Sequence, residues 1–215
     1  MDAYKYQRTL HLPWSRTVSK DDKLIKDIRT LISDDIVVLE KMDGENANLY
    51  TKYLHARSID FGYHESRDWL KRFHASISHN IPDNIKLCGE NVFAKHSIFY
   101  ENLMDYFLLF SIWDENKVCL SWDETVEWAE LLDVRLVPVL YRGPWDEKLL
   151  RDLPGKMDLN KQEGYVIRPA CQFKASEFSK KVAKYVRPNH VQTDEHWMKR
   201  KVIPNLLREG CERDI

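Results

Sequence analysis

The 215-residue sequence contains no apolar stretch close to the roughly 18 residues that a membrane-spanning helix needs. Its first residues lack the charged-then-apolar pattern of a secretory signal peptide. The four cysteines, Cys88, Cys119, Cys171 and Cys211, are widely scattered, and no Cys-x-x-Cys pair occurs. This spacing excludes a zinc-finger ligand set and argues against a disulfide framework. These absences favour a soluble cytoplasmic protein without membrane association.

A strong charge of either sign is also missing. Lysine and arginine number 33 against 34 aspartates and glutamates, giving a net charge of −1. Bulk charge therefore does not indicate a nucleic-acid partner, and any basic surface must be local. The sequence has no internal repeat, low-complexity tract or long linker, so we expect one domain over residues 1–215. Seven Trp and ten Tyr supply either core mass or faces for base stacking.

Apolar residues at helical spacing predict helices over 21–32 and 65–78, and a Ser121 to Glu124 capping box predicts a third helix. Further helices are expected over 145–153 and 194–208, the last one kinked or divided by Pro204. Strands are predicted over 36–40, 46–53, 85–92, 106–113, 136–141, 164–168 and 182–187. Because helices and strands mix without βαβ alternation, the expected fold class is α+β, with antiparallel β-sheets flanked by helices. Residues 191–215 are expected to form a C-terminal helical extension.

The segment Lys41-Met42-Asp43-Gly44-Glu45-Asn46 follows the apolar run at 36–39. Asp-Gly is a turn signal, so we expect Lys41 at the rim of a hairpin. An amine attacks a phosphate only when deprotonated, and a free lysine has a pKa of about 10.4. Partial burial and nearby cations lower that pKa, and Gly44 lets the backbone approach a nucleotide closely. The alternative is an ordinary hairpin with a solvated lysine.

Four further positions could contribute to a nucleotide-binding site with Lys41, and each also has an ordinary structural explanation. Glu90 ends a strand and could contact a ribose or a metal, or simply face solvent. Phe110, in the aromatic strand 106–113, could stack on a purine, or pack in the core. Glu163 precedes Gly164 and an alternating strand. Lys184 lies in a basic strand that could clamp a triphosphate or protect a sheet edge.

In this order, the segments resemble the motifs of the covalent nucleotidyltransferase superfamily of polynucleotide ligases and mRNA capping enzymes. Asn46 stands where capping enzymes and DNA ligases usually have arginine, so the sequence resembles the ATP-dependent RNA ligase branch. The resemblance implies a nucleotidyltransferase domain with ATP as co-substrate and Mg²⁺ or Mn²⁺ as metal. It implies RNA with 5′-phosphate and 3′-hydroxyl ends as partner, joined through lysyl-AMP and RNA-adenylate intermediates in RNA repair.

The resemblance also assigns roles to residues. It makes Lys41 the nucleophile and gives nucleotide contacts to Glu40, Lys41, Asn46, Arg57, Glu90, Phe110, Val166 and Lys184. It gives the phosphate or RNA end to Lys95, His96 and Arg187, and the metal to Asp43 and Glu163. His190 and His196 are expected to pack or cap, and the basic cluster 199–201 either tracks a phosphate backbone or is a solvated helix face.

The sequence departs from the family pattern near its last motif. Val186 stands where a second lysine is usual, which makes Arg187 or Lys181 the candidate replacement. Larger relatives carry an appended domain such as an OB fold, and none is expected here. A minimal DNA ligase, a capping guanylyltransferase and a catalytically inactive nucleic-acid-binding relative remain the alternatives.

Overall fold

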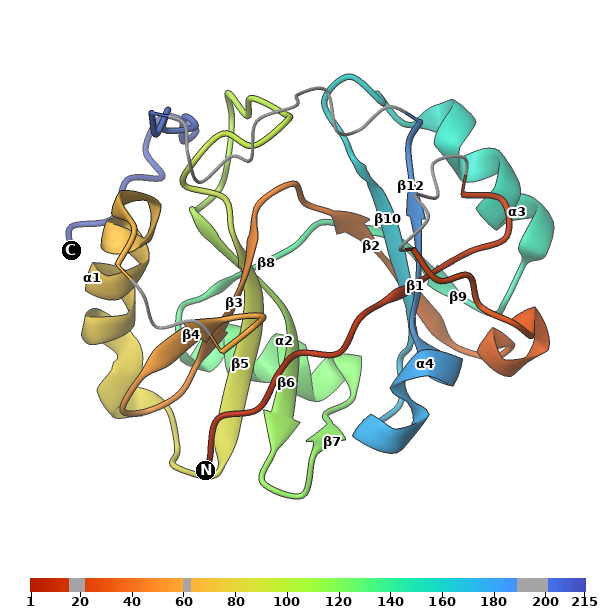
Figure 1. The fold of residues 1–215 in the computed structure, drawn as a ribbon, viewed down its shortest axis with the longest axis horizontal. Helices are drawn as coiled ribbons and strands as arrows, with labels where there is room; N and C mark the ends of the chain where they lie inside the picture. The colour runs from red at the N-terminus through yellow and green to blue at the C-terminus, as the bar shows by residue number, and fades with distance from the viewer. Residues whose placement is uncertain (16–21, 60–62, 189–200) are drawn as a thin grey trace.

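The computed structural model describes residues 1–15, 22–59, 63–188 and 201–215. Two β-sheets stand side by side with short helices around them (Figure 1). The first sheet has the order β1 (Leu10–His11), β12 (Ala183–Val186), β10 (Gly164–Pro169), β2 (Ile36–Lys41) and β9 (Val139–Gly143). The second has the order β11 (Phe173–Lys174), β7 (Val118–Cys119), β6 (Phe107–Asp114), β5 (Ile85–Asn91), β3 (Glu45–Leu49) and β4 (Leu54–Ala56), with β8 (Arg135–Leu136) on β6. Most pairings are antiparallel, which confirms the predicted α+β class.

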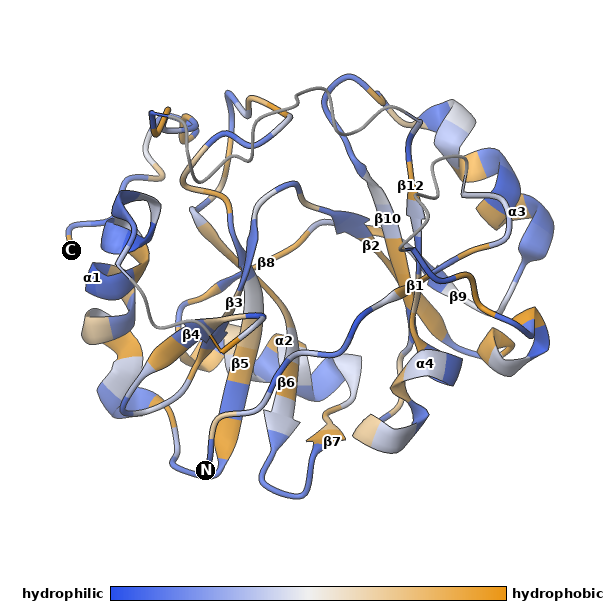
Figure 2. Ribbon diagram, viewed as in Figure 1, coloured by the Kyte–Doolittle hydropathy of each residue, from blue (hydrophilic) through white to orange (hydrophobic). Residues whose placement is uncertain are grey.

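The helices cover the outer faces of both sheets. They are α1 (Asp68–Ile77), α2 (Trp122–Leu131), α3 (Glu147–Asp152), α4 (Phe178–Lys181) and the 3₁₀ turns η1 (Ile28–Leu31), η2 (Glu65–Arg67), η3 (Ser78–Asn80), η4 (Leu153–Lys156) and η5 (Ala175–Glu177). The predicted helices at 65–78 and 145–153 are confirmed, as is the Ser121 to Glu124 capping box that opens α2. Apolar residues gather on the strands and on the helix faces turned toward them (Figure 2).

Two predicted helices, over 21–32 and 194–208, are wrong for the parts of these ranges that the structure describes. Of the described residues in 21–32, only η1 is helical, because residues 23–25 run extended along β1. The His11 amide donates to the Lys23 carbonyl at 2.8 Å, and the Ile25 amide donates to the His11 carbonyl at 2.8 Å. Residues 201–208 contain no helix and lie along the 94–103 loop, where Leu206 N donates to Tyr100 O at 2.8 Å. Tertiary pairing has replaced helical hydrogen bonds in both segments.

The predicted strands at 36–40, 85–92, 106–113, 164–168 and 182–187 are confirmed to within two residues. The strand expected over 46–53 stops at Leu49, because the Tyr50 amide closes a turn by donating to Tyr53 O at 2.9 Å. The strand expected over 136–141 is two strands, β8 and β9, which belong to different sheets. The chain therefore crosses between the sheets near Val137 and Pro138.

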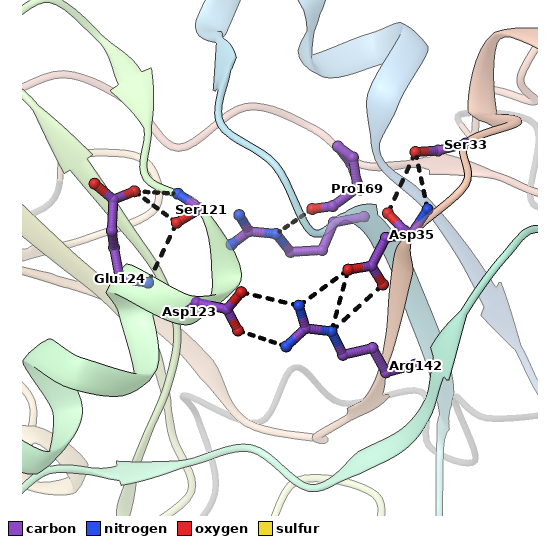
Figure 3. Close-up of polar contacts among 8 residues, drawn as sticks. Ser33, Asp35, Ser121, Asp123, Glu124, Arg142 and Pro169 are labelled. Atoms are coloured by element: carbon purple, nitrogen blue, oxygen red, sulfur yellow. Dashed lines mark hydrogen bonds and ion pairs between the residues drawn. The ribbon is translucent and has the colours of Figure 1, made fainter.

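An ion-pair cluster joins the two halves beside this crossing (Figure 3). Arg142 on β9 donates to Asp35 at 2.9 Å and to Asp123 of α2 at 2.9 Å. These carboxylates raise the pKa of the Arg142 guanidinium above its usual value. The cluster thus connects the first sheet to the helix that covers the second.

Residues 1–9 form a second connection between the sheets, crossing the front of the molecule in Figure 1. The Tyr53 hydroxyl donates to Met1 O at 2.6 Å, which holds this segment to the turn between β3 and β4. Gln7 donates to Ala175 O at 2.6 Å on the far side. All four cysteines are free, as the sequence predicts. Among the described residues, no helix is long and apolar enough to cross a membrane.

Candidate active site

Lys41 is the last residue of β2, but the expected hairpin after it is wrong. β2 pairs with β10 and β9 in the first sheet, whereas β3 pairs with β4 and β5 in the second. Residues 42–44 therefore carry the chain from one sheet to the other. A Cβ on Gly44 would lie 2.4 Å from the carbonyl oxygen of Asn91, so the crossing is too close for any side chain there. The glycine serves close backbone approach rather than a hairpin turn.

A cavity of about 560 Å³ lies beside this crossing, between the two sheets. Every residue to which the sequence assigned a nucleotide contact lines it: Glu40, Lys41, Asn46, Arg57, Glu90, Phe110, Val166 and Lys184. These residues come from six strands and one turn that are distant in sequence. The antiparallel pairing brings them together, and Glu90 lies directly opposite Asn46 in the register of β5 and β3.

The Lys41 amine is paired with Glu163 at one end of the cavity. The distance from Nζ to the Glu163 Oε2 atom is 2.7 Å, and the two side chains are 22% and 4% exposed. Burial lowers the pKa of Lys41, but the charges of Glu163 and Glu90 outweigh burial and raise it above its ordinary value. The residues around this amine therefore raise its pKa, where the sequence led us to expect a lowered one, because two acids lie near it. Lys41 is therefore protonated at neutral pH.

Two other groups at this end are strongly perturbed. Burial raises the pKa of Glu90 to about 8, although the charge of Lys41 opposes the shift. Burial also lowers the pKa of Lys184 to about 8, and the nearby Lys41 charge lowers it further. Perturbed groups that converge on a cavity mark candidate functional sites. Here they surround a lysine that could act as nucleophile.

Part of the cavity lining is apolar and aromatic. Phe110 is half-buried and lines it, together with Val166 from the other sheet. The edge of the Tyr6 ring packs against Phe110 with 5.4 Å between centroids, in a T-shaped geometry. Phe107 is instead fully buried against Phe73 in the core behind the second sheet. Phe110 and Val166 thus offer apolar surface to a flat aromatic ligand.

The two predicted metal residues differ in what they offer. Glu163 presents a buried carboxylate beside the cavity. The Oδ2 atom of Asp43 already accepts hydrogen bonds from the Ser97 and Ile98 amides, both at 2.7 Å, and so anchors the 97–98 loop. Within the described ranges, no group of three or more His, Cys, Asp or Glu side chains could hold a metal by itself. Magnesium usually binds through one or two carboxylates, waters and substrate phosphates, which fits Glu163 better than Asp43.

The residues predicted for the phosphate or RNA end do not line the cavity. Lys95 is exposed on its loop, and its amide donates to Ile203 O at 2.8 Å. His96 lies beside it on the same loop. Arg187 is buried, with its guanidinium donating to the Leu159 carbonyl. His190, His196 and the first two members of the cluster 199–201 lie outside the described residues.

Sequence reasoning missed several cavity residues, among them Tyr6, Arg8, Arg67 and Arg168. Arg168 is 3% exposed, and its guanidinium donates to the Leu120 carbonyl at 2.6 Å. The alternation of strand 164–168 places Arg168 on the same face as Val166, and this period could have revealed it. Tyr6 and Arg8 precede the first predicted element, so nothing in the local pattern indicated them.

Comparison with known proteins agrees with this geometry. The family model described as RNA ligase matches residues 34–186. The chain belongs to the RNA ligase family. Curated proteins give no match to it.

Solved structures show the same fold. A putative ATP-dependent DNA ligase from Aquifex aeolicus matches with a TM-score of 0.57 at 18% identity, over 86% of this chain and 50% of its own. An archaeal ATP-dependent RNA ligase matches with a TM-score of 0.60 at 14% identity, over 85% and 48%. A variant of the Naegleria gruberi RNA ligase with ATP and Mn matches with a TM-score of 0.52 at 18% identity, over 86% and 57%. This RNA ligase family member spans about half the length of the first two.

Proposed function

We propose that this RNA ligase family member joins RNA 5′-phosphate and 3′-hydroxyl ends at the expense of ATP, through lysyl-AMP and RNA-adenylate intermediates, in RNA repair. One observation carries the proposal: the Lys41 amine, 2.7 Å from the Glu163 carboxylate, shares a cavity with the seven other residues that the sequence assigned to a nucleotide. A covalent intermediate divides one difficult step into easier ones. Binding of ATP and a divalent metal by the Naegleria gruberi relative agrees with the proposal.

In the first step, Nζ of Lys41 attacks the α-phosphorus of ATP. The charged amine first loses one proton, either to the Glu163 Oε2 atom at hydrogen-bond distance or to water when that carboxylate turns away. A nitrogen–phosphorus bond then forms as the bond to pyrophosphate breaks, and Nζ loses its second proton to water. Once the carboxylate turns away, burial becomes the larger influence and lowers the pKa of Lys41. Lys184 places positive charge beside the leaving phosphates.

In the later steps, a 5′-phosphate oxygen of RNA attacks the adenylate phosphorus and frees Lys41. A 3′-hydroxyl oxygen then attacks the RNA 5′-phosphorus, and AMP leaves. A hydrated magnesium ion near Glu163 would supply charge neutralisation for the phosphates. Phe110 and Val166 would hold the adenine, and Glu90 would accept a hydrogen bond from the ribose.

Covalent labelling tests the proposal directly. The protein is incubated with α-labelled ATP and magnesium and then separated by denaturing electrophoresis. We expect a label on the wild type and on Lys148→Ala, an exposed lysine on α3, and none on Lys41→Ala. A wild type that no nucleotide labels would favour an inactive nucleic-acid-binding relative.

Substrate choice is tested by sealing assays on nicked RNA and nicked DNA with labelled 5′ ends. We expect RNA to be sealed. Sealing of DNA alone would assign the chain to DNA ligation, as in its Aquifex aeolicus structural relative. Labelling by GTP in preference to ATP would indicate capping chemistry instead.

A further inference from the structure

A second groove of about 520 Å³ lies outside the cavity, between the segment 23–30 and α4. Figure 1 shows α4 and η1 near the same end of the first sheet. The floor of the groove is apolar and is formed by Leu10, Leu24 and Ile25. Its basic residues are Lys23, Lys26 and Lys180. The groove therefore combines an apolar floor with three positive charges.

These three positive charges are not neutralised by the described part of the chain. None of Lys23, Lys26 and Lys180 takes part in an ion pair with a described residue. The one carboxylate of the groove, Asp27, is held by the Arg29 guanidinium through two contacts of 2.9 Å. In a protein whose net charge is −1, this is a local basic surface.

The groove adjoins the nucleotide cavity through β1 and β12. Leu10 in the groove pairs with Ala183, while the neighbouring residues Thr9 and Lys184 line the cavity. Lys180 precedes β12 by a few residues, on the helix that leads into it. One pair of strands thus has the cavity on one side and the groove on the other.

We propose that this groove binds the sugar–phosphate backbone of the RNA strand that the active site receives. Phosphates would meet the three lysines, and ribose and base surfaces would lie on the apolar floor. Contacts to phosphates position a strand without reading its sequence, which suits an enzyme that repairs ends. The inference rests on the proposed RNA ligase function, and it adds a substrate-binding surface that lies apart from the nucleotide pocket.

The test separates RNA binding from nucleotide chemistry. The Lys23→Ala, Lys26→Ala, Lys180→Ala triple variant is compared with wild type and with a matched triple variant of exposed lysines elsewhere, Lys52→Ala, Lys148→Ala, Lys156→Ala. Affinity for a labelled single-stranded RNA and for a nicked RNA duplex is measured at several salt concentrations. Covalent labelling with ATP alone is measured in parallel on the same samples.

For the groove variant, we expect RNA affinity to fall roughly 10-fold to 100-fold at moderate salt. The slope of log affinity against log salt should fall by about 2 for single-stranded RNA, because three phosphate contacts contribute about 0.7 each. Labelling by ATP should be unchanged, and the matched control should behave as wild type in both assays.

Other results overturn the inference. An unchanged salt slope in the groove variant would show that the lysines meet no phosphate. Loss of ATP labelling in that variant would show that the groove supports the nucleotide site. Sedimentation of wild type with phosphatidylserine vesicles, lost in the groove variant while RNA affinity persists, would assign the surface to a membrane. Failure of wild type itself to take up label from ATP would instead refute the proposed function.

Discussion

Replacing Glu163 with glutamine is expected to lower the pKa of Lys41 in the free protein. The Nζ to Oε2 distance is 2.7 Å, and two unit charges at this separation attract by about 6 kcal/mol at an effective dielectric constant of about 20. Hydration of the released groups and the remaining amide contact offset much of that energy. Since about 1.4 kcal/mol is a tenfold change in an equilibrium, we expect the ratio of neutral to charged Lys41 to rise roughly 100-fold.

Competitive acetylation measures this pKa without nucleotide or metal. The rate of Lys41 modification by acetic anhydride, followed by mass spectrometry from pH 7 to 10, reports the fraction of neutral amine. At pH 8 the glutamine variant should react roughly 100-fold faster than wild type, because the reaction rate follows the fraction of neutral amine. Glu40→Gln is the control, because Glu40 lines the same cavity but bonds to Gln162 at 2.9 Å.

The same substitution should slow adenylylation by ATP, because in the proposed mechanism this carboxylate takes a proton from Lys41 and lies where the metal would bind. The ion pair stabilises the fold at neutral pH, and on the alkaline side this contribution is lost as pH rises through the raised pKa of Lys41. Glu163→Gln should therefore be less stable than wild type at pH 7 in urea unfolding. Equal acetylation rates for the variant and wild type at pH 8 would refute the electrostatic account of Lys41.

Three further substitutions give separate expectations. Lys184→Met should raise the free energy of unfolding at pH 7 by about 1–3 kcal/mol, because charged Lys184, with a pKa of about 8, opposes folding below that pH. The gain should shrink as urea unfolding is repeated toward pH 10, and a less stable variant at pH 7 would contradict the assignment. Phe110→Leu should weaken ATP binding about 10-fold in calorimetry, since stacking on a base contributes about 1–3 kcal/mol, and unchanged affinity would remove Phe110 from the base site. Gly44→Ala should cost about 1–3 kcal/mol in thermal unfolding and slow ATP labelling, because its Cβ would meet a backbone oxygen at 2.4 Å, and a wild-type melting curve would contradict the crossing geometry.

Local pattern in the sequence was sufficient for most strands, and the family resemblance was sufficient for eight of the residues that line the cavity. Alternation in 164–168 and the apolar run at 36–39 reflect burial, which side-chain chemistry encodes position by position. Eight residues predicted to contact a nucleotide do line one cavity. The order of the motifs along the chain was informative because the strands that carry them are arranged as in a known fold.

Pairing partners were harder to predict. The Asp-Gly pair after Lys41 has the composition of a hairpin turn, yet β2 finds its partner β10 more than a hundred residues later. The same competition removed the helix expected near Ile25, whose amide bonds to the carbonyl of His11. Helical spacing of apolar residues indicates which side chains will be buried. A distant strand edge can also bury those side chains and bond their backbone amides, so the segment need not be helical.

Charge state was the other quantity that the sequence did not reveal. Lowering of a lysine pKa by burial is sound reasoning for an isolated amine. Glu163, however, lies 122 residues along the chain from Lys41, and its charge together with that of Glu90 outweighs burial, so the pKa of Lys41 is raised and not lowered. Local sequence does not predict such an ion pair, because it forms only when the strands that carry the two residues pair in the folded sheet.

The division of the cavity between two sheets has a thermal consequence. Lys41 belongs to the first sheet and Phe110 to the second. Residues 42–44 connect β2 of the first sheet to β3 of the second. An adenylate bonded to Lys41 and stacked on Phe110 would link the two sheets and stabilise their packing against each other. Ligand that binds only the folded form raises its melting temperature, and a covalently attached one cannot dissociate on dilution. A preparation that is partly charged with AMP should then melt as two populations, the later one carrying the nucleotide.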